Sequence, residues 1–146
     1  MSQRAADTRT PQDRFPEALA LANRANDELI EGRGGLLRDC FSHREDATLF
    51  GGFGGHEVGW SQIGPRLEWV AQSFAGGRCA YEVLASDAGS ELAFVVQFER
   101  GKARITGRTD PLALDFRVTM VFRWENGGWR LLHRHADHLA GKQKPT

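Results

Sequence analysis

The dipeptide Asn126-Gly127, set between two strand-like runs, is the feature that most restricts how this chain folds. Asn-Gly is favoured in two-residue type I′ turns, because both central residues of that turn require a positive φ. A turn here pairs residues 114–124 with residues 129–138 as an antiparallel hairpin. The hairpin therefore predicts that the C-terminal part of the chain is a sheet.

The register of this hairpin decides which side chains share a face. With no bulge, Thr119 lies opposite Arg134, and one face gathers Arg117, Thr119 and Arg134. The other face then carries these titratable side chains: His133, His135 and Asp137. Side chains alternate along a strand, so a one-residue bulge, for which Gly128 offers a position, would exchange the two sets.

Apolar periodicity before the hairpin predicts three helices and further strands. The predicted helices are residues 12–33, a short stretch at 36–41, and 61–74, the last ended by Gly76-Gly77. The predicted strands besides the hairpin are residues 47–50, 79–86 and 91–100. This order indicates an α+β fold, in which three N-terminal helices pack against a curved antiparallel sheet.

Length, charge and cysteine content exclude several classes of protein. The 146 residues make one domain, for which we expect a flexible lead-in at 1–11, a core at 12–138 and a flexible tail at 139–146. Lys and Arg number 19 and so do Asp and Glu, and a net charge of zero argues against a nucleic-acid partner. No apolar run reaches the roughly 18–20 residues of a membrane span. The polar N-terminus predicts a cytoplasmic location, and two cysteines are too few for a disulfide framework.

Several segments together resemble a known superfamily. They are Glu45–Phe50 leading to Phe53-Gly54, Gly59–Ile63, Arg117–Thr119 and Gly128–Asp137. Their order and spacing are similar to those of the nuclear transport factor 2-like superfamily, in its SnoaL-like and ketosteroid isomerase-like branch. The resemblance covers about residues 12–138 and implies a cone-shaped fold with a pocket at one end, usually assembled as a homodimer.

The isomerase mechanism of that branch does not carry over to this chain. The resembling isomerases hold a base aspartate just after the first strand, where this chain has Gly51, and a second acid where it has Thr119. Their tyrosine on the first helix corresponds to Asn26 or Asp27. Glycine cannot accept a proton, so the resemblance implies the fold and a pocket but disfavours the isomerase mechanism.

The hairpin offers two candidate sites. Arg117 and Arg134 near the Thr119 hydroxyl would bind a carboxylate or an enolate oxygen, since guanidinium groups bind such oxygens bidentately. His135 oriented by Asp137 would act as a general acid or base near neutral pH. We take His135, Asp137 and Thr119 as catalytic candidates and Arg117 and Arg134 as ligand-binding candidates. The alternative is structural: the arginines pair with Asp115, Glu99 or a dimer partner, and the histidines are hydrogen-bonded in the core or a dimer seam.

Three further residues are ligand-binding candidates. His56 lies in the glycine-rich stretch Gly51–His56, Trp69 would stack on an aromatic ligand, and Asn26 takes the position of the isomerase tyrosine. An exposed loop histidine and a core tryptophan are the structural alternatives. We expect no metal and no cofactor, because the sequence lacks CxxC and HExxH motifs and its glycine run lacks the spacing of a phosphate loop.

These observations predict a SnoaL-like protein with a pocket for a small organic molecule. One reading is a cofactor-independent acid–base enzyme of the isomerase, dehydratase or cyclase type, acting on an organic acid or polyketide-like substrate. The other is a non-catalytic ligand-binding or dimerisation module of the same fold. The hairpin has apolar residues on both faces, so we also expect a homodimer through the sheet, anchored by Trp124 and Trp129.

Overall fold

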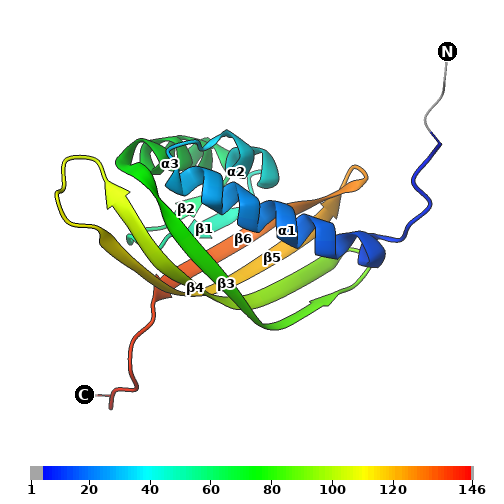
Figure 1. Ribbon diagram of the computed structural model, residues 1–146. Helices are drawn as coiled ribbons and strands as arrows, with labels where there is room; N and C mark the ends of the chain where they lie inside the picture. Colours follow the sequence, from blue (N-terminus) through cyan, green and yellow to red (C-terminus); the bar gives the residue numbers. More distant parts are fainter. Residues whose placement is uncertain (1–4, 146) are drawn as a thin grey trace.

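The computed structural model describes residues 5–145 and contains three helices and six strands. In chain order these are α1 (Pro11–Ile30), α2 (Gly35–Cys40), β1 (Thr48–Phe50), β2 (Glu57–Val58), α3 (Trp60–Ser73), β3 (Phe74–Ala88), β4 (Leu92–Ile105), β5 (Leu112–Glu125) and β6 (Gly128–His138). The helices lie on one side of a curved sheet, and the opposite side carries none (Figure 1). The predicted α+β class, with three N-terminal helices on one side of a sheet, is confirmed.

The six strands form one mixed sheet in the order β2-β1-β6-β5-β4-β3. All neighbouring pairs are antiparallel except β1 and β6, which run parallel. The expected purely antiparallel sheet is therefore wrong at this one pair. The reason is connectivity: β1 enters the sheet from the helical layer beside the last strand of the chain, so no hairpin turn fixes its direction.

Helix α1 is fixed at its start by local chemistry and by tryptophan packing. The Thr10 hydroxyl accepts a hydrogen bond from the backbone N–H of Asp13, and the Asp13 carboxylate accepts one from the N–H of Thr10. This reciprocal arrangement satisfies two backbone donors at the helix start. Trp129 then donates from Nε1 to the carbonyl of Pro11 at 2.8 Å, and its ring meets Phe15 edge-on.

The two tryptophans that flank the turn pack against each other and against α1 of the same chain. Trp124 and Trp129 meet edge-to-face with ring centroids 5.4 Å apart. The Arg14 guanidinium of α1 lies 5.1 Å from the centre of the Trp124 ring. The expectation that this pair anchors a dimer is not supported, because the contacts of the pair hold α1 against the hairpin.

The Asn126-Gly127 turn forms as predicted, with φ values of 50° and 83°. The expected register holds from the turn as far as the pairing of Phe122 with Leu131. A bulge at Leu132 follows, so the ladder resumes with Val121 opposite His133. The unbroken register is therefore wrong beyond this point, and every side chain of β6 after Leu132 lies on the face opposite to the one expected.

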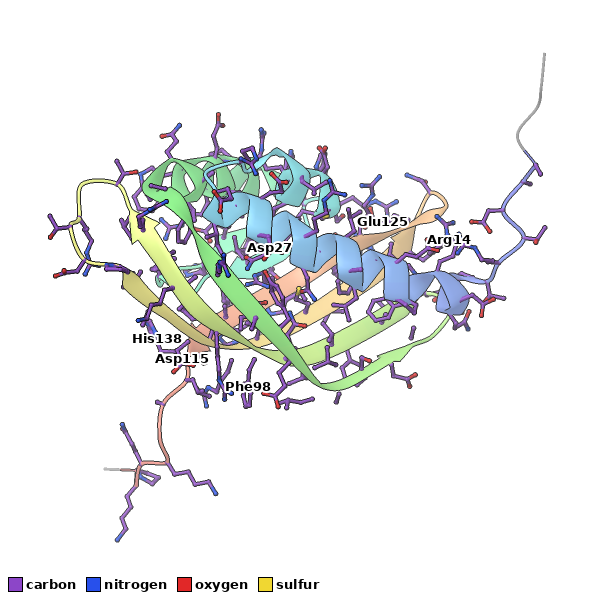
Figure 2. The ribbon with its side chains drawn as sticks, in the orientation of Figure 1. Arg14, Asp27, Phe98, Asp115, Glu125 and His138 are labelled. Atoms are coloured by element: carbon purple, nitrogen blue, oxygen red, sulfur yellow. The ribbon has the colours of Figure 1, made fainter. Side chains whose placement is uncertain are left out.

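The bulge has a packing cause. Leu131 and Ala136 are five residues apart, so in a regular strand they would point to opposite faces. With the extra residue both are buried against the helices, at 0% and 5% exposure. Arg134 is carried to the same buried face, because it lies two residues before Ala136. We call the opposite side of the sheet the outer face; Phe98 and Asp115 point from it, away from the helices (Figure 2).

Strand β3 begins earlier than the sequence suggested. Helix α3 ends at Ser73, and Gly76-Gly77 belong to β3, where the register with β4 shifts. Gly76 has a φ of 109°, which other residues rarely adopt. The expectation that these glycines end a helix is wrong: they form an irregular start of β3, and a Cβ on Gly77 would lie 2.2 Å from the carbonyl oxygen of Lys102.

The ends of the chain bear on the predicted domain limits. Residues 5–10 and 139–145 have no regular secondary structure, and α1 begins at Pro11, one residue before the expected core. Residues 1–4 of the lead-in and residue 146 of the tail lie outside the described residues, and the flexibility of both segments stays a prediction. Among residues 5–145, no helix combines the length and the apolar character that crossing a membrane requires.

Candidate functional site

A cavity of about 80 Å³ lies between the helices and the buried face of the sheet. We call it the inner cavity. Its walls are mostly apolar and include Leu29, Ile30, Leu67, Val70, Leu114 and Phe116. Its polar lining comes from Asn26, Arg66, Glu99 and Arg134, with the thiol of Cys79 beside them. An apolar cavity with a few convergent polar groups is the usual form of a small-molecule site.

Glu99 and Arg134 form a bidentate ion pair at this cavity. Arg134 donates from Nη2 to Oε1 of Glu99 at 2.7 Å and from Nη1 to Oε2 at 3.0 Å. The side chains are 2% and 12% exposed, so the pair is removed from water. It joins β4 to β6 across β5.

Each member of this pair stabilises the charged form of the other. Burial by itself would raise the pKa of Glu99, but the charge of Arg134 and hydrogen bonds from Arg134 and Gln97 outweigh it and lower that pKa. Burial likewise opposes the charge of Arg134, and Glu99 outweighs it and raises the pKa of the guanidinium. The pair therefore presents an ionised carboxylate beside an ionised guanidinium, with no net charge between them. The other guanidinium of the lining, Arg66, lies 3.7 Å from the carboxylate of Glu57.

Amide side chains hold the carboxylate in place. Gln97, completely buried, donates from Nε2 to Oε2 of Glu99 and to Oδ1 of Asn23, both at 2.9 Å. Asn26 on α1 donates from Nδ2 to the hydroxyl of Tyr81 at 3.0 Å and reaches Oε1 of Glu99 at 3.5 Å. These bonds connect the charged pair on the sheet to the buried side of α1.

Tyr81 ties the other end of this network to α1. Its hydroxyl lies 2.7 Å from Oδ1 of Asp27 and 3.1 Å from the carbonyl of Asn23, both acceptors on α1. Figure 2 labels Asp27, which extends from α1. Burial raises the pKa of Tyr81 well above its usual range, and the bond to Asp27 adds to the rise despite the opposing bond from Asn26. The phenol thus stays a hydrogen-bond donor.

The bulge separates the guanidinium groups that the hairpin had been expected to bring together. Arg134 lines the inner cavity, whereas Arg117 and Thr119 are exposed on the outer face. Arg117 donates from Nε and Nη2 to the Asp137 carboxylate at 2.9 and 3.1 Å. The expected site of Arg117, Thr119 and Arg134 is therefore wrong, and the structural alternative, pairing with Glu99, describes Arg134.

The predicted acid–base residues lie outside the inner cavity. His135 is exposed on the outer face, with Nε2 3.8 Å from Oδ2 of Asp137. Its neighbour His133 is held by a 2.7 Å hydrogen bond between Nδ1 and the Thr48 hydroxyl. Burial, and then the charge of His135, lower the pKa of His133. His135 lies on the opposite side of the sheet from the inner cavity, so it cannot act on a ligand bound there.

The remaining predicted residues occupy three different places. Asn26 lines the inner cavity, and its role in ligand binding stays a prediction. His56 lies on a shallow groove beside Asp137 and His138. Trp69 is 57% exposed, lines a separate cavity and carries the Arg66 guanidinium 4.5 Å from the centre of its ring. Of the predicted set, the structure therefore brings Asn26 and Arg134 together at the inner cavity. A second group lies together on the outer face: Arg117, Thr119, His135 and Asp137.

The separate cavity, about 300 Å³, lies at the end of α3 beside the β4–β5 hairpin. We call it the outer cavity. It is lined by Phe53, Trp69, Val70, Ser73, Phe74, Ile105, Arg108, Leu112 and His138. Phe53, Val70 and Phe74 also line the inner cavity, so the two spaces share a wall.

Sequence reasoning missed Glu99 as a site residue and named it only as a possible arginine partner. A signal was present: Gln97 and Glu99 continue the buried positions of Ala93 and Val95 along β4, and buried polar residues on a core face need a partner. Cys79 also lines the inner cavity. Burial and the charge of Glu99 raise its pKa to about 11, so it lines the cavity as a thiol.

Comparisons with known proteins place the chain in a family. A SnoaL-like domain model matches residues 20–138. No curated protein matches the chain. The chain belongs to the SnoaL-like family, which confirms the SnoaL-like resemblance drawn from its motifs. It shares its fold with nuclear transport factor 2-like and ketosteroid isomerase-like proteins.

Solved structures give the same fold at low identity. A protein from Streptomyces avermitilis, provisionally named a dehydratase of the nuclear transport factor 2-like family, is 18% identical with a TM-score of 0.73, over 88% of this chain and 99% of that one. A ketosteroid isomerase-like protein from Erwinia carotovora atroseptica is 15% identical with a TM-score of 0.73, over 89% and 97%. A protein from Novosphingobium aromaticivorans, provisionally named a scytalone dehydratase, is 16% identical with a TM-score of 0.67, over 85% of each chain.

Proposed function

We propose that this chain binds a small, largely apolar organic molecule in the inner cavity, with one hydroxyl or carbonyl group on the ion pair of Glu99 and Arg134. The observation that carries the proposal is that an ion pair removed from water lines a mostly apolar cavity. A buried ion pair stabilises a fold little or not at all compared with apolar residues of the same size. Its position at the cavity is explained by recognition of a polar ligand group.

The opposite charges of Glu99 and Arg134 limit which polar groups a ligand can place beside them. A hydroxyl group would donate to the Glu99 carboxylate, and a carbonyl oxygen would accept from Arg134 or Asn26. A carboxylate placed at the same point would meet a guanidinium that Glu99 already neutralises. The inner cavity therefore suits a phenol or ketone of the polyketide-like kind better than an organic acid.

Binding of such a ligand requires the walls to yield. An apolar cavity of about 150 Å³ accommodates benzene, whereas the inner cavity measures about 80 Å³. The wall shared with the outer cavity includes Phe53 on the glycine loop Gly51–Gly55 and offers room for that adjustment.

Calorimetric titration with 2-naphthol, a bicyclic phenol, tests the proposal. We expect the wild-type chain to bind it and the double variant Glu99→Gln/Arg134→Met, which removes the pair together, to bind at least tenfold more weakly. Arg117→Gln is the matched control, because it breaks an exposed ion pair on the outer face. Equal affinity of the double variant and the wild type, or no binding to the wild type, contradicts the proposal.

A second candidate function is cofactor-independent acid–base catalysis of the isomerase, dehydratase or cyclase type. Glu99 favours it, since among residues 5–145 it is the sole carboxylate lining the inner cavity. It would take a proton next to a substrate carbonyl while Arg134 holds the resulting oxyanion. The dehydratase names of two structural relatives point the same way, but the lowered pKa of Glu99 makes it a weak base, so binding is the preferred function.

Deuterium exchange separates catalysis from binding alone. An acid–base enzyme would accelerate exchange of the protons next to the carbonyl of 1-tetralone in D₂O, followed by proton nuclear magnetic resonance. The acceleration would disappear in Glu99→Gln and persist in Arg117→Gln. A protein that binds 1-tetralone without accelerating exchange is a binding module for this class of ligand.

We also propose a homodimer formed through the outer face. Phe94 on β4 is 41% exposed there, and the neighbouring Val96, Phe98 and Val121 are only partly buried within one chain. A second copy packed on this face would cover them. The cytoplasmic location and the absence of nucleic-acid partners remain predictions from composition.

A further inference from the structure

Phe53 stands in the wall that the inner and outer cavities share. Phe53 faces both spaces and is 46% exposed. Its ring centroid lies 5.9 Å from that of Phe74, in a tilted arrangement, and 6.0 Å from that of Phe116, which it meets edge-on. The ring is thus half exposed and stands between two apolar spaces.

The backbone around Phe53 favours movement of that ring. Gly54 and Gly55 have φ values of 93° and 75°, a region that glycine enters without strain. Gly52 lies so close to Phe116 that a Cβ there would sit 2.5 Å from the ring. The loop thus contacts the core at Gly52 and turns at Gly54 and Gly55, directly after Phe53. An outward turn of Phe53 would leave the contact at Gly52 in place.

The charges of the outer cavity differ from those of the inner one. Its charged or titratable lining consists of Arg108 and His138, with no carboxylate among the described lining residues. Within residues 5–145, no acidic side chain forms an ion pair with Arg108. A free guanidinium at the end of an apolar channel is a fitting partner for a carboxylate.

We propose that the two cavities form one elongated site, divided at rest by Phe53, for an apolar molecule with a carboxylate on Arg108 and a hydroxyl or carbonyl group on Glu99 and Arg134. This inference rests on the proposed function and specifies its ligand: an aromatic or alicyclic hydroxy or keto acid. Joined, the cavities approach the several hundred Å³ typical of ligand sites. The carboxylate of the ligand then binds in the outer cavity to Arg108, whose charge no acidic side chain of the described residues neutralises.

Calorimetry with 6-hydroxy-2-naphthoic acid tests this assignment, because its rigid rings separate a hydroxyl from a carboxylate. We expect wild type to bind it more tightly than 2-naphthol. Arg108→Gln weakens the acid about tenfold, the loss of one charge-assisted hydrogen bond, and leaves 2-naphthol unchanged. Lys102→Gln is the matched control: it removes one exposed charge of β4 outside both cavities and changes neither affinity.

Phe53→Ala gives an independent readout on the dividing wall. We expect at least threefold tighter binding of 6-hydroxy-2-naphthoic acid, since no ring has to be displaced. Unchanged or weaker binding in Phe53→Ala, or equal loss of both ligands in Arg108→Gln, overturns the elongated site. If 2-naphthol binds through Glu99 and Arg134 while the acid binds no tighter, this inference fails and the proposed function stands; if neither binds, both fail.

Discussion

The Glu99 carboxylate on β4 and the Arg134 guanidinium on β6 meet across β5 in two hydrogen bonds of 2.7 and 3.0 Å. They are the paired charges of the inner cavity, where the remaining lining is mainly apolar. Their contact depends on the Leu132 bulge, which carries Arg134 to the buried face. Stability, its dependence on pH and ligand binding are therefore connected through this one pair.

Breaking the pair from one side should destabilise the protein strongly. Arg134→Met leaves Glu99 charged and buried without its partner, at a cost of about 3–5 kcal/mol. The double variant Glu99→Gln/Arg134→Met should recover most of that loss, because no unpaired charge remains. Urea unfolding of the wild type, both single variants and the double variant measures the coupling. Additive single losses would show that the pair does not act as a unit.

The lowered pKa of Glu99 predicts sensitivity to acid. Its folded pKa lies below the ordinary value of 4.5, so the unfolded state binds the proton more readily. The stabilisation is fully present above pH 4.5 and is lost as pH falls through the folded pKa. Unfolding free energies measured from pH 6 downward should fall more steeply in the wild type than in Glu99→Gln/Arg134→Met. Parallel curves would contradict an ionised, stabilised Glu99.

His133 predicts a second pH effect at higher pH. Its folded pKa lies below the ordinary value of 6.5, because burial and then the charge of His135 disfavour its protonated form. Stability is therefore greatest above pH 6.5 and declines as pH falls through the folded pKa. His133→Gln should flatten this decline in thermal unfolding between pH 7 and 5, and His135→Gln, on the exposed neighbour, should not abolish it. The same slope in His133→Gln and wild type would refute the assignment.

The outer face predicts the oligomeric state. Light scattering on the eluting protein should give twice the chain mass for wild type. Phe94→Glu should give a monomer, because a carboxylate in the centre of the interface would be buried without a partner. Leu21→Glu, an equally exposed leucine of α1, is the control and should remain a dimer. A monomeric wild type, or a dimeric Phe94→Glu, would rule out an interface on this face.

The parts of the fold that could be predicted from the sequence are those with local causes. The Asn126-Gly127 turn follows from the positive φ that both residues accept. The start of α1 follows from Thr10 and Asp13 three residues apart. The order of the helices and of every strand except β2 follows from periodicity, and the SnoaL-like family follows from the combined motifs.

The composition of the inner cavity depends on where β6 is bulged, and contacts between residues far apart in the sequence determine that position. A bulge at Leu132 lets both Leu131 and Ala136 be buried, but it interrupts the hydrogen-bonded ladder between β5 and β6. The Asn-Gly turn is compatible with a bulged strand and with a regular one, so the turn alone does not decide between them. Because one residue of slip exchanges faces, the error moved Arg134 away from Glu99 and placed it beside Arg117. Glu99 is one of the partners that the sequence offers for the arginines, and the register of the strands selects it for Arg134.

A crystal structure of the chain with 2-naphthol bound tests the central claim most directly. We predict the naphthol oxygen within about 3 Å of Glu99 or Arg134, with the rings among Leu29, Leu67 and Phe116. Density for the ligand on the outer face near Arg117, or in the groove beside His56, with the space beside Glu99 unchanged, would contradict the account.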